Sequence, residues 1–382
     1  MFLFFLTPFT LHPSPVSAAE QTVRVLLLED VPSARVTITT PCRAVDLATG
    51  KVLDQWDHFK WQELETRNPN FIKLGKKGAV SVQAVVLEPL GDDPVIRLNA
   101  RPYRGALIVI RNDDNKLTFI NRVDLEDYLG SAVASEADPK WPAEALKAHA
   151  VVSRTAVAHR IWISKDKPYD VTDDTRTHVY HGIAAEREST RSAALDTYGQ
   201  VLSFRGELVS ATFHANCGGH TEWADAIWSV KRMIPALVGR EDPYCQGLKH
   251  SHWKSNITFT ELQQRLGSAG QKLGRITGLS VTRRSRSGRA GELLLQGSQN
   301  SLRISGKEFR GLLGANNLRS LKFDVQLLQG SVYFSGSGWG HGVGLCQWGA
   351  YGQAVQGRTM DEILAFYFQE SQHRKLKGLP GF

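Results

Sequence analysis

The chain has 382 residues, of which 42% are apolar, so it can form one large domain or two ordinary ones with a packed core. Its formal net charge is +8 and its pI is about 9.3, yet Lys and Arg are scattered and never form a block of five. This pattern gives no ground for a nucleic-acid partner, and it equally suits a protein that meets an acidic polymer.

The first 18 residues are expected to be a signal peptide that is cleaved on export. Residues 1–11 are largely apolar, and Val16, Ser17 and Ala18 supply the small side chains that a signal peptidase prefers. The run is too short for a bilayer span of about 20 residues, and no later run of 18 apolar residues follows. No basic residue precedes Arg24, so an apolar N-terminal strand is the alternative. We therefore expect an exported protein of the periplasm or cell envelope.

Residues 19–115 are predicted to be a β-rich N-terminal region. Short runs rich in β-branched residues, separated by Gly, Asp and Pro, are typical of strands. These runs are VRVLLL (23–28), SARVTITT (33–40), AVSVQAVVLEP (79–89) and GALIVIRN (105–112). A turn is expected at Thr49-Gly50.

Helical patterns begin near Val123. Apolar side chains at 125, 128, 129, 132 and 133 follow a helical period, which Pro139 and Pro142 interrupt. Pro142 suits a first helical residue, and the 20 residues after it, AEALKAHAVVSRTAVAHRIW, contain no Gly or Pro. Ala and Val occur on nearly every face of this second helix, so we expect neighbours to bury most of its sides.

From residue 198 the pattern returns to strands, with a hairpin turn at Arg205-Gly206. Further helices are predicted to start in TFTELQQRLG (258–267) and at Thr359, which stands three residues before Glu362 in a capping-box pattern. The predicted fold class is therefore α+β: mixed β-sheet structure with a buried helix at the active site and a β-rich N-terminal part. A second domain is predicted to span residues 116–370.

Glu136 and Arg154 stand out beside this buried helix. In a helix that begins at Pro142, Lys147 and Arg154 share one face with apolar residues. Arg is almost never buried without a partner, so Arg154 needs an anion there. Glu136, folded back by the Asp138-Pro139 turn, or a bound ligand can supply it. The alternative is that Arg154 reaches solvent and Glu136 merely ends a helix.

The stretch LEDYLGSAVASEADPKWPAEALKAHAVVSRTAVAH (125–159) resembles the signature of the stage II sporulation protein D and amidase-enhancer family (SpoIID/LytB). Segments at 198–228, 304–320 and 335–357 resemble three further family motifs in the expected order. The resemblance is highly specific, and it covers the chain from the end of the β-rich region almost to the C-terminus. The residues that match in the first motif are Leu125, Glu126, Tyr128, Leu129, Glu136, Trp141, Pro142, Glu144, Ala145, Leu146, Lys147, Ala148, Ala150, Val151, Arg154 and Thr155, while His149 replaces the usual Gln.

The resemblance implies a lytic transglycosylase that cleaves peptidoglycan glycan strands stripped of their stem peptides. Glu136 matches the family's catalytic glutamate, and Arg154 matches its supporting arginine. One carboxyl group suffices for such chemistry, because the substrate's own C6 hydroxyl serves as the nucleophile, whereas glycoside hydrolysis usually takes two. The acid works best with a raised pKa, which apolar neighbours favour and Arg154 opposes. Arg154 is therefore expected to contact substrate or to orient Glu136 at some distance, and Lys147 or Arg154 to attract the anionic strand.

A glycine-alternating segment, GSGWGHGVG, occupies residues 336–344. If it is extended, Trp339 and His341 point to one face, and the glycine face lets another backbone or a sugar ring lie close. Tight packing in the core is one interpretation. We favour a cleft wall on the resemblance, with Trp339 stacking on glycan, His341 hydrogen-bonding to it and Gln347 extending the surface.

The cysteines and histidines leave alternatives open. His214, Cys217 and His220 lie at close spacing, with Cys245, His250 and His252 downstream, so a zinc site is conceivable. Some members of the resembling family hold zinc through a His and two Cys, but the matching stretch YDVTDDTRTHVYHG (169–182) has no cysteine. A Cys217–Cys245 disulfide is favoured for an exported protein. Cys42 and Cys346 are interpreted as buried small side chains. We expect no cofactor.

Three functions are therefore weighed. The first is the exported transglycosylase, with peptidoglycan strands as its partner. The second is a non-catalytic glycan-binding module that enhances a cell-wall amidase, probed by whether Glu136→Gln abolishes cleavage. The third is a zinc hydrolase using His214 and His220, which chelators would inhibit. The retained Glu136 favours the first.

Overall fold

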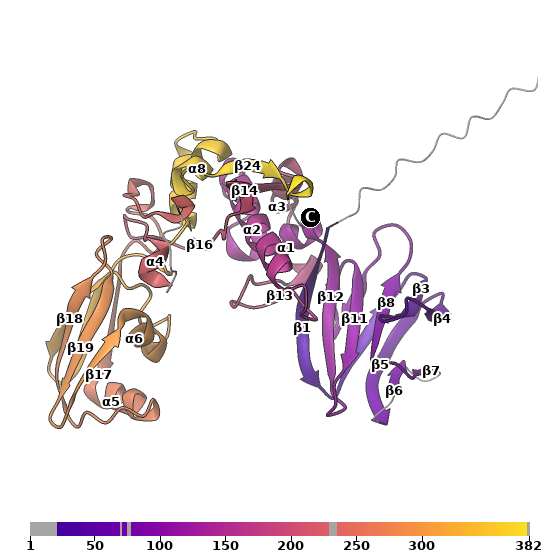
Figure 1. The fold of residues 1–382 in the computed structure, drawn as a ribbon, viewed down its shortest axis with the longest axis horizontal. Helices are drawn as coiled ribbons and strands as arrows, with labels where there is room; N and C mark the ends of the chain where they lie inside the picture. The colour runs from indigo at the N-terminus through magenta and orange to yellow at the C-terminus, as the bar shows by residue number, and fades with distance from the viewer. Residues whose placement is uncertain (1–20, 69–70, 75–77, 229–234, 380–382) are drawn as a thin grey trace, which may run out of the picture.

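The computed structural model describes residues 21–68, 71–74, 78–228 and 235–379. The expected signal peptide, 1–18, lies outside the described residues. Figure 1 shows the N-terminal strands at one end of the molecule, helices α1, α2 and α3 in the middle, and strands β17, β18 and β19 with helices α5 and α6 at the other end. No helix in the described part of the chain is long and apolar enough to cross a membrane.

Two sheets build the N-terminal part. The first runs in the order β13-β1-β12-β11-β8-β3-β4 and the second in the order β10-β9-β2-β5-β6-β7. Their pairs are antiparallel, except that β13 joins β1 in parallel. The first sheet consists of β1 (Thr22–Val31), β3 (Cys42–Asp46), β4 (Val52–Trp56), β8 (Ala84–Pro89), β11 (Ala106–Arg111), β12 (Leu117–Asp124) and β13 (Val171–Thr172). The second consists of β2 (Ser33–Ile38), β5 (Phe59–Asn68), β6 (Phe71–Leu74), β7 (Gly78–Val80), β9 (Ile96–Leu98) and β10 (Arg101–Tyr103).

One apolar core joins the two sheets, because alternate residues of each strand face inward. Val36 and Leu64 from the second sheet belong to the same buried cluster as Leu107 and Phe119 from the first. The predicted β-rich N-terminal region is thus confirmed, including the turn at Gly50, which has a positive φ. The boundary expected at 115/116 falls between β11 and β12, and every residue of β11 pairs with β12, so it does not separate two sheets.

Three helices follow the first sheet directly. α1 (Leu125–Glu136) starts after Asp124, whose side chain accepts from the amides of Glu126 and Asp127 as an N-cap. α2 (Ala143–Ile163) starts after Pro142 and is buried on most of its surface, as its sequence predicts. α3 (Glu188–Asp196) packs against both, and the 3-10 helix η1 (Gly182–Ala184) leads into it.

The remaining elements form smaller sheets and short helices. β14 (Gln200–Phe204) lies between β15 (Glu207–Leu208) and β24 (Gln372–Lys375), and β16 (Phe213–His214) pairs in parallel with β23 (Leu345–Cys346). The helices here are α4 (Ala224–Ile227), α7 (Gln347–Val355) and α8 (Met360–Tyr367), with 3-10 turns η2 (Pro235–Leu237), η3 (Pro243–Cys245) and η4 (Leu376–Gly378). α8 has the predicted capping box between Thr359 and Glu362.

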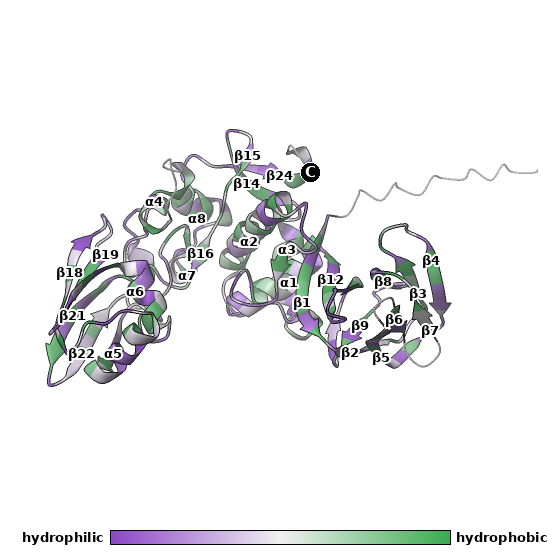
Figure 2. Ribbon diagram, turned by 60° about the horizontal axis from the view of Figure 1, so that its bottom comes forward, coloured by the Kyte–Doolittle hydropathy of each residue, from purple (hydrophilic) through white to green (hydrophobic). Residues whose placement is uncertain are grey.

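The distal end has its own apolar core. Two three-stranded sheets surround it with α5 (Phe259–Ser268) and α6 (Gly306–Leu313). The strands are β17 (Trp253–Thr258), β18 (Ile276–Arg284), β19 (Ala290–Gly297), β20 (Ser301–Ser305), β21 (Phe323–Leu328) and β22 (Ser331–Gly336). Figure 2 shows that these strands carry both hydrophobic and hydrophilic residues, and β22 alternates between buried and exposed side chains, as expected for a sheet with one buried face. The fold is α+β, as predicted.

Candidate active site

Glu136 is the last residue of α1. The helix ends there because Ala137 is extended, and the Asp138 side chain accepts from the Lys140 amide to form a tight turn. Pro142 is the N-cap of α2, which begins at Ala143, so the carboxylate projects from the junction of the two helices. This junction faces β16 and the segment before β23, which come from much later in the chain.

A cleft of about 640 Å³ opens at this junction. Its walls come from the second half of α2, the loop before η1, the segment around β16 and the glycine-rich segment. Glu136 is the only carboxylic acid among its lining residues in the described part of the chain. The lining residues that carry polar or aromatic side chains are Glu136, His159, Arg160, Thr175, Arg176, Thr177, His178, Ser210, Thr212, Phe213, His214, Trp339, His341 and Gln347.

Two hydrogen bonds hold Glu136 in place. Its Oε1 accepts from the Val179 amide at 3.1 Å, and its backbone carbonyl accepts from Gln347 Nε2 at 2.9 Å. Burial raises the pKa of the Glu136 carboxyl above its ordinary value, and the Val179 hydrogen bond opposes that shift only in part. The negative end of the α1 dipole also disfavours a carboxylate here. The site therefore holds a carboxyl group that gains its proton more readily than a glutamate in water.

Neutral histidines surround this acid. Burial lowers the pKa of His178 to about 4, that of His149 to about 3 and that of His341 to about 4. His178 stacks on Phe213 with ring centroids 5.3 Å apart, and its Nδ1 lies 3.2 Å from the Tyr128 hydroxyl. Since these rings are uncharged near neutral pH, none of them offers Glu136 a cation that would lower its pKa.

Arg154 has another place than the one expected. Its side chain is fully buried, and its guanidinium forms a two-pronged ion pair with Glu126, which includes a 2.9 Å bond from Nε to Oε1. It also donates to the carbonyls of Ala194 and Gln200. The anion that Arg154 needs is therefore Glu126 and not Glu136, and Arg154 is not among the described residues that line the cleft. A buried guanidinium needs a carboxylate beside it. The packing of α2 on α1 places Arg154 beside Glu126, in the first turn of α1, and not beside Glu136, its last residue.

Lys147 also lies apart from the cleft. Its Nζ pairs with Glu144 at 3.3 Å and with Asp196 of α3 at 3.2 Å. It is not among the residues that line the cleft around Glu136. Its helix face points toward α3, so the predicted role of Lys147 in drawing the strand to Glu136 has no support in this geometry.

The glycine-rich segment is not the extended strand that its alternation suggested. Gly338, Gly340, Gly342 and Gly344 all have positive φ, so the chain turns at every second residue. A Cβ on Gly340 would lie 2.7 Å from the Cβ of His214. Gly338, Gly340 and Gly344 thus allow tight packing against residues 212–218, and Gly342 allows it against Arg289. Trp339, His341 and Gln347 line the cleft together with Glu136. The segment is thus tightly packed and also forms part of the cleft wall, while the contacts of Trp339 and His341 with glycan stay a prediction.

Several cleft residues escaped the sequence analysis. His178, Phe213 and the cations Arg160 and Arg176 all line the cleft. The sequence of the 173–181 loop has no periodicity from which its position in the fold could be predicted. In the structure it contacts Glu136 through the Val179 amide, which donates to the carboxylate. Arg160 lies near the C-terminal end of α2, and no sequence motif marked it as a site residue.

The expected disulfide is not formed. All four cysteines are free, and the sulfurs of Cys217 and Cys245 lie 3.3 Å apart. Among the described residues, neither His214 nor His220 belongs to a group of three or more potential metal ligands. His214 lines the cleft instead, where its Nδ1 lies 3.2 Å from the Val343 carbonyl.

Comparison with known proteins places these motifs in context. A family model described as stage II sporulation protein matches residues 113–204, and one described as a domain of unknown function matches 231–344. An uncharacterized protein of Brachyspira hyodysenteriae is 32% identical over 272 residues, which make up 71% of this chain and 72% of that protein. Stage II sporulation protein D of Bacillus subtilis is 29% identical over 274 residues, 66% of this chain and 75% of that protein.

The amidase enhancer of Bacillus subtilis is also similar. It is 26% identical over 285 residues, which make up 63% of this chain and 39% of that longer protein. The chain therefore spans well under half of the amidase enhancer.

Proposed function

Because this chain belongs to the SpoIID family of stage II sporulation protein D and amidase-enhancer proteins, we propose that it is an exported lytic transglycosylase of peptidoglycan. It would cleave glycan strands that lack stem peptides and leave 1,6-anhydromuramic ends. The observation that carries the proposal is Glu136, a single carboxyl group with a raised pKa in a cleft lined by no other acid in the described part of the chain.

A single acid can perform both proton transfers of this reaction. In the first step the Glu136 proton moves to the glycosidic oxygen as the bond from that oxygen to the muramic C1 breaks. In the second step the Glu136 carboxylate takes the proton of the C6 hydroxyl, and the oxygen of that hydroxyl bonds to C1. The carboxyl group is regenerated, and no water is consumed. Hydrolysis would need a second carboxylate, and the described residues of the lining offer none.

The environment of Glu136 suits the first step. A general acid must be protonated at the working pH, and burial raises the pKa of Glu136 in that direction. The Val179 amide stabilises the carboxylate that the first step leaves behind. Gln347 holds the backbone carbonyl of Glu136, so the acid keeps its position through both transfers. In this account Gln347 is a positioning residue.

The walls of the cleft offer contacts for a sugar chain. Trp339 and Phe213 present aromatic rings, which stack on the apolar faces of sugars. The Val343 carbonyl can only accept, so His214 carries its proton on Nδ1, and its Nε2 is an acceptor without a partner among the described residues. His341 accepts from the Val343 amide at Nδ1, which leaves the proton on its Nε2. Both rings are therefore held in fixed orientations in the wall of the cleft, beside Trp339.

Two arginines take the role that the sequence gave to Lys147. Each muramic residue of a denuded strand carries a free lactyl carboxylate. Arg160 is exposed at the cleft, and no carboxylate pairs with it in the described part of the chain. Arg176, also at the cleft, is paired with Asp174 at 2.9 Å. Arg160 is therefore the cation that a lactyl group would meet first.

The second candidate is a glycan-binding module that enhances a cell-wall amidase, and the similarity to the amidase enhancer favours it. A binder has no use for a carboxyl group with a raised pKa in its cleft, which is why we rank it second. The test compares wild-type protein with Glu136→Gln on amidase-treated glycan strands. Fragments released by the wild type and absent with Glu136→Gln, while both proteins co-sediment with the strands, support the enzyme. Equal binding, no fragments from either protein and faster amidase turnover support the module.

A further inference from the structure

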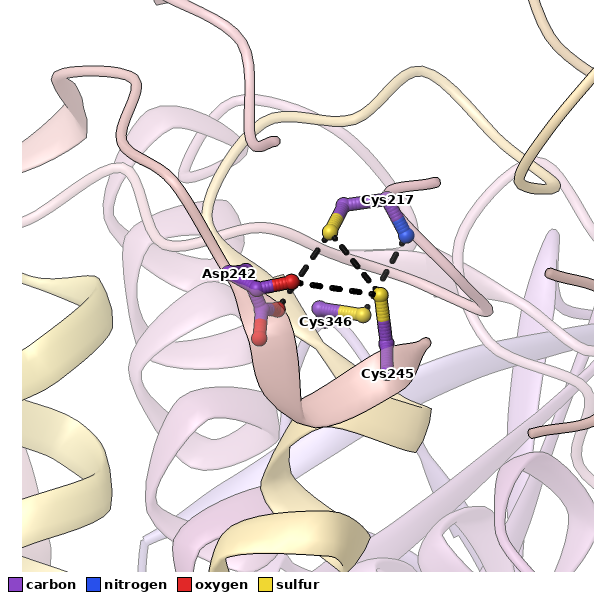
Figure 3. Close-up of side chains that lie close together, drawn as sticks. All are labelled: Cys217, Asp242, Cys245 and Cys346. Atoms are coloured by element: carbon purple, nitrogen blue, oxygen red, sulfur yellow. Dashed lines mark hydrogen bonds between the residues drawn. The ribbon is translucent and has the colours of Figure 1, made fainter. Parts of the chain in front are cut away.

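A cluster of three thiols and one carboxylate lies behind the cleft wall. Cys217, Asp242, Cys245 and Cys346 each offer one ligand atom, and all four atoms lie within 4.8 Å of one another. Figure 3 shows the three sulfurs and the Asp242 carboxylate gathered around one point. All four residues are buried. Three segments supply them: the loop after β16, the turn of η3 and the start of α7.

The spacing of these atoms fits one metal ion. Cys217 Sγ lies 3.3 Å from Cys245 Sγ and 3.3 Å from Asp242 Oδ2. A tetrahedral zinc with bonds of about 2.3 Å to sulfur sets its sulfur ligands about 3.8 Å apart. Four ligand atoms within 4.8 Å of one another can close to that geometry by small side-chain rotations. From these residues we propose that the protein holds a structural zinc ion at Cys217, Asp242, Cys245 and Cys346.

The groups around the cluster are those of a metal–thiolate site. The amides of Cys217 and Gly349 both donate to Cys346 Sγ, at 3.2 and 3.3 Å. The Tyr367 hydroxyl donates to Asp242 Oδ2 at 2.8 Å, and the Tyr244 amide donates to Asp242 Oδ1 at 3.0 Å. Hydrogen bonds of this kind orient thiolate and carboxylate ligands around a metal. The two amides that donate to Cys346 Sγ would stabilise a thiolate there, whereas a neutral thiol would offer them no charge.

Charge balance points the same way. Three thiolates and a carboxylate around a divalent ion carry an excess of negative charge, which needs nearby cations. Arg289 is buried and donates to the Cys217 carbonyl at 2.7 Å, and no carboxylate lies within ion-pairing distance of it among the described residues. Lys322 Nζ donates to the neighbouring Gly218 carbonyl at 2.8 Å. The buried Glu222 carboxylate supports Arg289 through Ser287, which accepts from Arg289 and donates to Glu222. An anionic zinc site would add further negative charge beside this arginine.

The zinc would have a structural role and no catalytic one. Four protein ligands close the coordination sphere, and the site is buried away from the cleft lining. Cys346 immediately precedes Gln347, which holds Glu136, and Cys217 follows the His214-Ala215 pair that lines the cleft. The ion therefore fixes two walls of the cleft at once. The site is also distinct from the stretch 169–182, which contains no cysteine.

The test measures metal in the purified full chain. Wild type, grown with zinc and purified without chelator, is expected to contain about one zinc per chain by mass spectrometry of the elements. Cys346→Ser should lower the zinc affinity by at least about tenfold, while Cys42→Ser, which removes a buried cysteine of β3, should keep the full content. Cobalt exchanged into the wild type should give intense tetrahedral thiolate absorption bands.

The remaining outcomes overturn the proposal. If the intact mass shows the loss of two hydrogens and no zinc is present, Cys217 and Cys245 form a disulfide and there is no zinc site. If all thiols stay free and zinc-free after growth in zinc, the cluster is ordinary packing. Should Cys346→Ser fail to fold, the cobalt spectrum and zinc content of the wild type still decide. None of these readouts depends on glycan cleavage, so the zinc site and the proposed enzyme can fail separately.

Discussion

The side-chain amide of Gln347 lies 2.9 Å from the backbone carbonyl oxygen of Glu136, although 211 residues separate them in sequence. The same amide nitrogen lies 2.9 Å from His149 Nε2, on the helix that follows Glu136. One side chain of α7 thus joins the end of α1 to the middle of α2. The first and last motifs of the chain meet at the candidate acid.

Gln347→Ala should lower glycan cleavage far more than it lowers stability. The substitution leaves the Glu136 carbonyl and His149 without their donor, at a cost of about 1–3 kcal/mol in unfolding free energy. A displaced acid reduces kcat about a hundredfold when the shift is near 1 Å. Cleavage rates and urea unfolding check this. The control is Gln356→Ala, an exposed residue after the same helix. Unchanged kcat in Gln347→Ala would contradict the positioning role.

Arg154→Met should destabilise the fold by about 3–5 kcal/mol, because it leaves the Glu126 carboxylate buried without its cation. Glu126→Gln should cost a similar amount, and the double variant should cost less than the sum. Denaturant unfolding measures all three. Arg160→Met, an exposed arginine on the same helix, should change stability by less than about 0.5 kcal/mol. A fully stable but inactive Arg154→Met would restore a catalytic role for Arg154.

Glu136→Gln should make the protein more stable than wild type near neutral pH. Burial raises the pKa of Glu136 in the folded state, so the folded state favours the protonated carboxyl. That contribution is complete below the unfolded value of about 4.3 and is lost as the pH rises through the folded value. The difference between the variant and the wild type should therefore shrink toward about pH 4. Thermal unfolding across pH tests it, with the exposed Glu188→Gln as control. A pH-independent difference would mean that Glu136 titrates normally.

Arg160→Gln should raise KM for denuded strands by up to about fivefold, with kcat unchanged, because an exposed charge contributes at most about 1 kcal/mol. The effect should fade at high ionic strength. Lys147→Gln is the matched control, since its Nζ pairs with Glu144 and Asp196 away from the cleft. If Lys147→Gln raised KM and Arg160→Gln did not, the strand would run along α3 instead.

Local pattern predicted what depends on neighbours in sequence. The Thr359 capping box, the turn at Gly206 and the long helix after Pro142 follow from near contacts, and all three are confirmed. Pairing across the chain was harder. Nothing in periodicity says that Arg154 meets Glu126 rather than Glu136, because both carboxylates lie on α1 and only the packing of α1 on α2 chooses between them.

The cysteines show the same limit. From the sequence we predicted a disulfide between Cys217 and Cys245, and we interpreted Cys346 as a small buried side chain. Parallel pairing of β16 with β23 brings Cys346 beside Cys217, and Asp242 joins from η3. No sequence spacing marks an aspartate as a neighbour of distant cysteines, so only the folded structure shows that these four residues lie together. In the glycine-rich segment, four glycines have positive φ, so the chain turns repeatedly where the sequence suggested an extended strand.

The central claim is that Glu136 closes a sugar ring without using water. Denuded glycan strands should be digested by the wild type in water labelled with heavy oxygen, and the new ends analysed by mass spectrometry. We expect anhydromuramic ends without the label, and none with Glu136→Gln. Reducing ends that carry the label would show hydrolysis, and anhydro ends that persist with Glu136→Gln would show that another group is the acid; either result would contradict the account.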